Sequence, residues 1–211
     1  MVTMQEIRSL IYEGRAKKVC DVIRQALEEG VSAKDILQQG MLPAMSEVGL
    51  KFKNNEVFVP EVLVSARAMN MGLECLKPYM SDMGLEPAGT VVIGTVKGDM
   101  HDIGKNLVRM MLEGKGLRVI DLGVDVPAER FFEAAEENGA DIICCSALLT
   151  TTMGEIKNVI AYLEEKGVRG KYRVMIGGAP VSQAYCDTIG ADCYTPDAAS
   201  AAEAALALCG K

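Results

Sequence analysis

The spacing of the apolar residues changes near residue 80, and this change limits the folds that the chain can adopt. Between Met4 and about Met80 the apolar side chains recur at helical spacing, which is typical of amphipathic helices. Gly14, Gly30 and the pair Asn54-Asn55 interrupt the pattern. Because such breaks separate helices, we expect a four-helix bundle with short connections, whose last helix runs from about Val57 to Tyr79.

After the polar stretch Ser81–Gly89, short runs rich in β-branched residues alternate with amphipathic segments. The expected strands are Thr90–Val96, Leu117–Leu122, Asp141–Ser146, Arg173–Ile176 and a weak Asp192–Tyr194. The expected helices are Ile103–Glu113, Ala128–Asn138, Met153–Lys166, Val181–Thr188 and an alanine-rich helix after Pro196. Strands separated by helices form parallel sheets that are covered on both faces. We therefore predict an α plus α/β chain: a helical domain over residues 1–85, then a flavodoxin-like or Rossmann-like domain with a parallel five-stranded sheet over residues 86–211.

Charge and cysteine content exclude several classes of function. The chain has 22 lysines and arginines against 29 aspartates and glutamates, a formal net charge of -7, so we expect no nucleic-acid partner. No apolar stretch has the length of a membrane span and no signal-peptide pattern begins the chain, so we expect a cytoplasmic protein without a membrane partner. The 7 cysteines include no C-x-x-C pair, and an odd number suits neither a disulfide framework nor a metal cluster. We expect buried free thiols.

Ligands of parallel α/β sheets bind beyond the carboxyl ends of the strands, where the first predicted strand leads into the loop Lys97–Asn106. This loop contains the only histidine of the chain, His101. A neutral imidazole is a good metal ligand, but one histidine alone cannot build a zinc site. The metal would have to arrive already coordinated, as cobalt does in a corrin ring. Asp99 is placed to contact the other ring nitrogen and fix its tautomer.

Two other interpretations of this loop remain open from the residues alone. Gly98 and Gly104 would let the main chain pass close to a flat cofactor, yet the loop is also compatible with a surface turn that carries an incidental histidine. Gly104–Asn106, at the start of a helix, would suit an anion, although the loop has neither the dinucleotide-binding nor the P-loop pattern.

Three short motifs follow successive predicted strands: Asp99-x-His101-x-x-Gly104, then Ser146-x-Leu148, then Gly177-Gly178. Together they resemble the cobalamin-binding signature of cobalamin-dependent methionine synthase and of the corrinoid proteins of methanol, methylamine and methoxy-compound methyltransfer systems. The resemblance spans nearly the whole chain. By themselves, a hydroxyl cluster such as Thr150–Thr152 is typical of a helix cap and a glycine pair of a turn.

The resemblance implies a cobalamin or related corrinoid cofactor with His101 as the metal ligand, in place of the cofactor's own nucleotide base. It implies that Asp99 and Thr152 complete a hydrogen-bond relay to His101, and these three form the expected catalytic set. Thr152 stands where the compared family member has serine. The implied cofactor contacts in the α/β domain are Gly98, Asp99, Met100, His101, Asp102, Ile103, Gly104, Ser146, Leu148, Thr150, Gly177, Gly178 and Ala198.

In the helical domain, Gly49–Val62 resembles the capping segment of the same family, whose apolar face covers the upper side of the corrin. Phe52, Val59 and Val62 match the covering positions, with valine at 59 where the family often has leucine. The helical domain would then be a cap that moves on a hinge in the polar stretch before the sheet. For Phe52 and Phe58 the alternative is the core of the bundle.

The function implied is that of a methyl carrier, a subunit that is not catalytic alone. Cobalt would take a methyl group as cobalt(I) from a substrate-specific methyltransferase and pass it, as methyl-cobalt(III), to a second methyltransferase; a reductive activation protein is a further candidate partner. One alternative is the small subunit of an adenosylcobalamin-dependent mutase, which lacks the helical cap. Another is a cobalamin-based light sensor, for whose DNA-binding domain the length and acidic charge leave no room.

Overall fold

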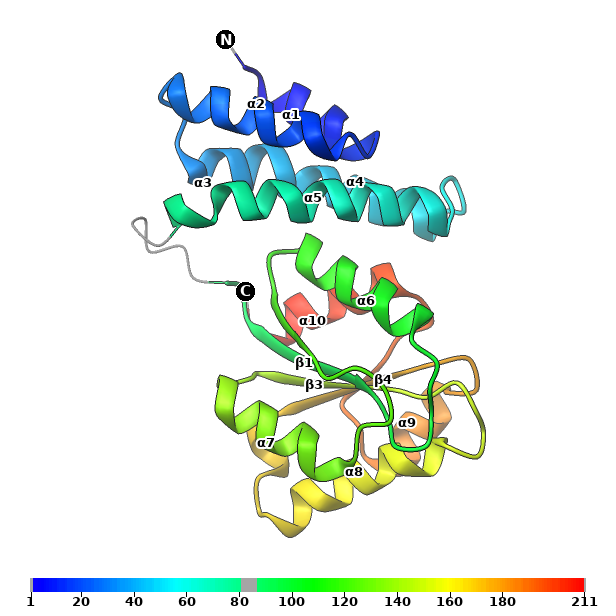
Figure 1. Ribbon diagram of the computed structural model, residues 1–211. Helices are drawn as coiled ribbons and strands as arrows, with labels where there is room; N and C mark the ends of the chain where they lie inside the picture. The colour runs from blue at the N-terminus through cyan, green and yellow to red at the C-terminus, as the bar shows by residue number, and fades with distance from the viewer. Residues whose placement is uncertain (1, 81–86, 211) are drawn as a thin grey trace. The chain divides into compact units, whose positions relative to one another are not determined.

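The computed structural model describes residues 2–80 and 87–210 (Figure 1). The chain divides into two compact units, Met1–Glu86 with Glu113–Gly116, and Pro87–Leu112 with Leu117–Lys211. The predicted hinge falls largely on residues 81–86, which lie outside the described residues. Within the described ranges, no helix has the length and apolar character needed to cross a membrane.

The helical unit is built, in its described part, from consecutive helical elements. These are α1 (Met4–Tyr12), α2 (Ala16–Glu28), α3 (Ala33–Asp35), the π-helical turn η1 (Ile36–Met41), α4 (Leu42–Lys53) and α5 (Val59–Met80). Since α3, η1 and α4 follow one another without a break, they make one long helical segment. The predicted helical region is therefore confirmed, with its last helix beginning at Val59.

The π-helical turn has a local cause in Pro43, in the first turn of α4. Proline has no N–H to donate, and its ring crowds the carbonyl group four residues earlier, which belongs to Gln39. That carbonyl oxygen accepts hydrogen bonds from Nε and Nη2 of Arg8 instead, at 2.8 and 2.6 Å. The irregular turn thereby connects the third helical segment to α1.

The helical unit also contains a disulfide bond that the sequence did not predict. Cys20 in α2 is bonded to Cys75 in α5, 55 residues further along the chain. The expectation of free thiols is wrong for this pair, because α2 packs along α5 and brings the two side chains together. Cys144, Cys145 and Cys186 are free thiols and are buried as expected.

The second unit is a doubly wound α/β domain, so the predicted fold class is confirmed. Its strands are β1 (Thr90–Thr95), β2 (Arg118–Asp121), β3 (Ile142–Ser146), β4 (Arg173–Gly177) and β5 (Cys193–Tyr194). Its α-helices are α6 (Ile103–Gly114), α7 (Ala128–Asn138), α8 (Met153–Glu165), α9 (Gln183–Ile189) and α10 (Ala198–Leu208). The strands are parallel in the order β2-β1-β3-β4-β5. Figure 1 shows α6 and α10 on one face and α7, α8 and α9 on the other.

β1 is an interior strand of this sheet, between β2 and β3, and its burial matches this position. All six of its residues are buried, as expected for a parallel strand that is covered on both faces. Gly94 leaves room for α7, since a Cβ atom there would lie 2.9 Å from the ring of Phe131. Phe131 belongs to the apolar core that α7, α8 and α9 form against the sheet. Apolar burial on both faces thus fixes the strand that leads into the histidine loop.

The strand order also determines where a ligand can bind. The connections that leave β1 and β3 go to helices on opposite faces, which makes the gap between these strands the topological switch point of the sheet. In the register of the sheet, Thr95 pairs with Ser146, and Ser146 pairs with Gly177. The three motifs found in the sequence therefore meet at one edge.

Candidate functional site

The histidine loop, residues 97–102, connects the end of β1 to the start of α6. Its main chain is fixed by Thr95, whose Oγ1 donates a hydrogen bond to the carbonyl oxygen of His101 at 2.8 Å. Asp99 is completely buried, whereas the side chain of His101 remains 49% exposed. The loop thus keeps its carboxylate inside the domain and presents its imidazole outward.

Asp99 is the centre of a hydrogen-bond network that connects two loops. Its Oδ1 accepts hydrogen bonds from the main-chain N–H of His101 at 3.1 Å and from Nδ1 of the same residue at 2.7 Å. Its Oδ2 accepts from the N–H groups of Leu148 and Leu149, at 2.8 and 3.3 Å, and from Oγ1 of Thr152 at 2.7 Å. The predicted catalytic set is brought together by these contacts.

The network fixes the charge of Asp99 and the tautomer of His101. Burial raises the pKa of Asp99, but hydrogen bonds from Thr152, His101 and Leu148 outweigh it and hold the pKa well below its usual range. An ionised carboxylate only accepts hydrogen bonds, so the proton between the two side chains belongs to Nδ1. The lone pair of Nε2 is then left for a metal.

Thr152 serves this network rather than capping the following helix. It is the N-cap residue of α8, yet its side chain makes no capping hydrogen bond. Its buried hydroxyl group donates to Asp99 and lies 3.0 Å from the carbonyl oxygen of Leu149. The contacts of Thr152 thus fit the hydrogen-bond relay that the resemblance implies, and they do not fit a helix cap.

Large apolar side chains are exposed around His101. Met100 is 68% exposed and Ile103 78%, while Leu148 and Leu149 of the β3–α8 loop are 42% and 41% exposed. Several exposed apolar side chains close together indicate a binding surface. Leu149 is the one exposed apolar residue of this group that was not predicted from the sequence. It could have been found as an apolar residue in a loop, where polar residues are usual.

The glycine pair after β4 has two different structural roles. Gly178 has φ +131, and a Cβ atom there would lie 1.8 Å from the carbonyl oxygen of Ala147, so only glycine fits. A Cβ atom at Gly177 would meet nothing within 4 Å. The first glycine of the pair therefore borders open space, as a residue lining a ligand slot should, and the second allows the ends of β3 and β4 to approach.

The remaining predicted contacts lie in the same unit. Gly98, Asp102, Gly104 and Thr150 are exposed, and Ser146 is half-buried at the end of β3. Ala198 is buried at the start of α10, which follows β5. Because parallel strands end at one edge of the sheet, all of these residues belong to the edge that carries the histidine loop.

The predicted covering residues belong to the helical unit. Phe52 in α4 and Val59 in α5 are half-buried, Val62 is completely buried, and Phe58 is 62% exposed. The alternative of a bundle-core position was given for Phe52 and Phe58, and the exposure of Phe58 does not fit it, whereas Val62 is buried in the helical unit. Whether these residues cover a corrin stays a prediction.

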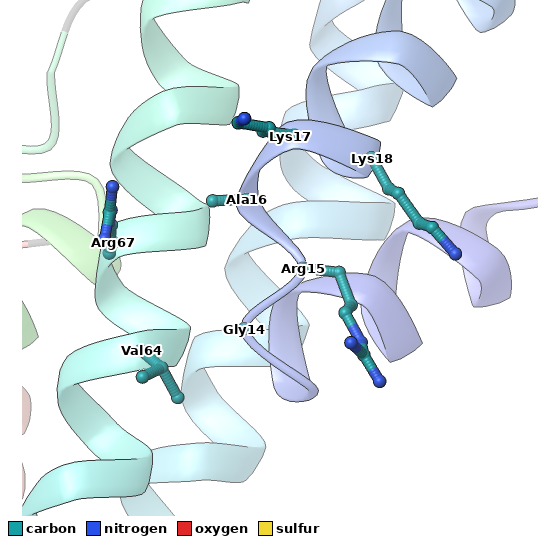
Figure 2. A pocket seen from close by; sticks show the side chains of 7 residues that line it. All are labelled: Gly14, Arg15, Ala16, Lys17, Lys18, Val64 and Arg67. Atoms are coloured by element: carbon teal, nitrogen blue, oxygen red, sulfur yellow. The ribbon is translucent and has the colours of Figure 1, made fainter.

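A separate hollow in the helical unit contains none of the predicted site residues (Figure 2). It lies between the start of α2 and the middle of α5, and its lining residues are Gly14, Arg15, Ala16, Lys17, Lys18, Val64 and Arg67. Figure 2 shows the side chains of Arg15 and Lys18 pointing away from α5. The hollow therefore gives no enclosed set of ligand-binding groups.

The groups at the sheet edge fit a corrin better than a metal ion alone. They supply one outward imidazole nitrogen, an apolar rim and open space beside Gly177. A corrin needs one axial nitrogen from the protein and an apolar surface for its ring. The fold and the site together define the class: a doubly wound α/β domain whose candidate ligand site lies at its topological switch point.

Comparisons with known proteins identify this class more closely. A family model described as a B12 binding domain matches residues 89–207, and a second model with the same description matches residues 3–77. The chain is 42% identical to a corrinoid protein of Desulfitobacterium hafniense over 100% of this chain and 99% of the relative. It is also 42% identical to the dimethylamine corrinoid protein of Methanosarcina barkeri, over 94% of this chain and 93% of the relative.

A solved structure supports the same family. The chain aligns with the methanol:cobalamin methyltransferase complex of Methanosarcina barkeri with a TM-score of 0.86 and 33% identity, over 97% of this chain and 78% of that chain. The chain belongs to the family of B12-binding corrinoid proteins. The predicted family and the predicted cofactor class, cobalamin or a related corrinoid, are thereby confirmed.

Proposed function

We propose that this chain is the corrinoid-carrying subunit of a methyltransferase system and that Nε2 of His101 is the lower axial ligand, with the cofactor's own base displaced. The observation that carries the proposal is the network of Asp99, which keeps the proton on Nδ1 and leaves Nε2 at the exposed edge of the sheet. Since the chain contains 1 histidine, no other imidazole competes for this role.

A bound corrinoid would supply the cobalt that accepts and releases the methyl group. The residues of this chain orient and protect it. Asp99 holds the imidazole ring, and Thr152 and the N–H of Leu148 hold Asp99. We retain Phe52, Val59 and Val62 as covering residues that exclude water from the upper face.

The expected partners follow from the relatives. One solved relative is a complex of a methanol:cobalamin methyltransferase, and several sequence relatives are methylamine corrinoid proteins. A methyltransferase specific for one methylated substrate is therefore the first proposed partner. We further propose two other partners, a second methyltransferase on the acceptor side and a reductive activation protein. The same proposal includes a cytoplasmic location and the division into domains 1–85 and 86–211.

The axial ligand is tested by reconstituting the chain and its His101→Ala variant with cobalamin. We expect the wild-type spectrum to be that of histidine-coordinated cobalamin with its own base displaced, and we expect the variant to lose that signature. If the variant binds cobalamin and its spectrum equals that of the wild type, the axial assignment is wrong. Thr151→Val, an exposed threonine outside the network, is the matched control.

The carrier role is tested with a tagged chain and the proteins that copurify with it. Loaded with methylcobalamin labelled on the methyl group, the chain should pass the label to a low-molecular-weight acceptor in the presence of a copurified methyltransferase. Loaded with adenosylcobalamin, it should neither transfer the adenosyl group nor start radical chemistry. Rearrangement of a substrate by the adenosylcobalamin form would favour a mutase subunit and contradict the proposal.

A further inference from the structure

Asp125, in the connection between β2 and α7, contacts the histidine loop through two hydrogen bonds. Its main-chain N–H donates to the carbonyl oxygen of Asp99 at 3.0 Å. In return, the N–H of Gly98 donates to Oδ1 of Asp125 at 2.7 Å. The bonds run in opposite directions between the same two segments, so they form a reciprocal clamp.

The clamp lies where strand pairing stops and the histidine loop begins. At the end of β1, next to the clamp, the carbonyl oxygen of Thr95 accepts a hydrogen bond from the N–H of Val126 at 3.0 Å, and Val96 pairs with Val126 in a parallel bridge. The β2–α7 connection therefore runs beside the end of β1 as an extension of the sheet. Asp125 continues this contact from the strand into the loop.

The main chain of Asp125 adopts a conformation that few side chains accept. Its φ is +55, and among the described residues only Asn55 shares a positive φ without being glycine. Aspartate and asparagine tolerate this left-handed region better than other residues with a Cβ atom. Such conformations persist where the surroundings hold them, and they cluster at functional sites.

Asp99 is consequently held from two directions. Thr152 and Leu148 bind its side chain, whereas Asp125 binds its main chain and that of Gly98. Since Nδ1 of His101 is bonded to Asp99, a shift of the Asp99 main chain would also turn the imidazole ring. We infer that Asp125 is a positioning residue that fixes the direction of Nε2 of His101 toward the cofactor, an inference that rests on the proposed function.

The first test uses the full chain without cofactor. In Asp125→Ala the Gly98 amide should exchange its hydrogen on the order of tenfold faster, because a hydrogen bond of ordinary strength is lost. Asp125→Asn keeps an acceptor oxygen and should exchange at the wild-type rate. The control is Asp141→Ala, because Asp141 accepts the N–H of Thr90 at 2.8 Å at the other edge of the same sheet, and it should leave Gly98 unchanged.

The second test measures binding of hydroxocobalamin and the spectrum of histidine coordination. Asp125→Ala should weaken binding on the order of tenfold and reduce the histidine-coordinated fraction, while Asp125→Asn restores both. Asp125→Gly keeps the left-handed main chain without the carboxylate, and it should behave like the alanine variant. If the glycine variant matches the wild type while alanine does not, backbone strain rather than the clamp is responsible, and the inference is wrong.

The outcome for the His101→Ala variant separates this inference from the proposed function. An altered spectrum of that variant, together with wild-type binding and exchange in Asp125→Ala, overturns the role of Asp125 alone. An unaltered spectrum of His101→Ala overturns the axial assignment. The clamp could then not serve to direct Nε2 toward the cofactor, so the inference would fall with the proposed function.

Discussion

Replacing Thr152 by valine removes one hydroxyl donor from the carboxylate of Asp99 and preserves the size of the buried side chain. The hydroxyl group lies 2.7 Å from Oδ2 of Asp99. That oxygen would retain the N–H of Leu148 at 2.8 Å and that of Leu149 at 3.3 Å. The variant therefore weakens the network without leaving the carboxylate unsatisfied.

The expected loss follows from the charge of the acceptor. A hydrogen bond to a charged group contributes about 1.5–3 kcal/mol, so the opening free energy of the α/β unit should fall by about that amount at neutral pH. One pKa unit corresponds to about 1.4 kcal/mol. The same loss therefore raises the pKa of Asp99 by roughly 1–2 units.

The effect should depend on pH in a defined direction. The pKa of Asp99 is depressed in the folded protein, so its stabilisation is complete above the ordinary carboxyl range and is lost as the pH falls through the folded value. Both proteins share the same unfolded reference, so the difference in opening free energy between wild type and Thr152→Val should stay constant until the pH approaches the folded pKa of Asp99 in the variant, below the ordinary carboxyl range, and should shrink as the pH falls through it.

Hydrogen exchange of buried amides in β1 and β3 measures this opening free energy without requiring the two units to unfold together. Thr152→Ser, which keeps the hydroxyl group, and Thr151→Val, which changes an exposed neighbour, should both stay close to wild type. Wild-type protection in Thr152→Val, or a loss that stays constant down to low pH, would refute the reasoning.

Three further predictions concern other parts of the same unit. Gly178→Ala should lower the unfolding free energy, measured by denaturant unfolding, by more than about 2 kcal/mol, because its Cβ atom would collide with a main-chain carbonyl oxygen. Gly177→Ala should change the unfolding free energy by less than about 0.5 kcal/mol, and it should weaken the binding of cobalamin measured by titration. Lys105→Met removes a buried ammonium group from the carboxylate of Asp121, 2.6 Å away; because that carboxylate is partly exposed and also faces Arg109, the variant should cost about 1.5–3 kcal/mol in denaturant unfolding, while Lys115→Met, at a partly exposed lysine, should cost far less. Burial raises the pKa of Cys145 to about 12, so its thiol should resist a thiol-specific reagent at neutral pH in the folded chain and react on unfolding.

The sequence predicts the sheet well because its strands are short apolar runs between amphipathic helices. The predicted Ala128–Asn138 coincides with α7, and the other predicted elements of the sheet domain differ from the observed ones by one or two residues at their ends. By contrast, the π-helical turn was missed, because Pro43 is also compatible with an ordinary first turn of a helix, and the contact of Arg8 with the carbonyl oxygen of Gln39 leaves no mark in the periodicity. The Cys20–Cys75 disulfide was missed for a similar reason, since only the packing of α2 on α5 joins residues so distant in sequence.

The candidate site was predictable in its side chains and not in its main-chain contacts. The motif around His101 identifies the loop, and Thr152 was found through the family resemblance. The N–H groups of Leu148 and Leu149 donate hydrogen bonds to Oδ2 of Asp99. They leave no trace in the sequence, because every residue except proline has such a donor. The clamp of Asp125 was missed for the same reason, as half of it is a main-chain bond.

The most direct measurement is electron paramagnetic resonance of the chain reconstituted with cobalamin in the paramagnetic cobalt(II) state, with its 1 histidine labelled with nitrogen-15. If Nε2 of His101 is the axial ligand, the nitrogen splitting should change from a triplet in unlabelled protein to a doublet in labelled protein. A triplet that persists in the labelled protein would mean that the cofactor's own base remains on cobalt, and it would contradict the account.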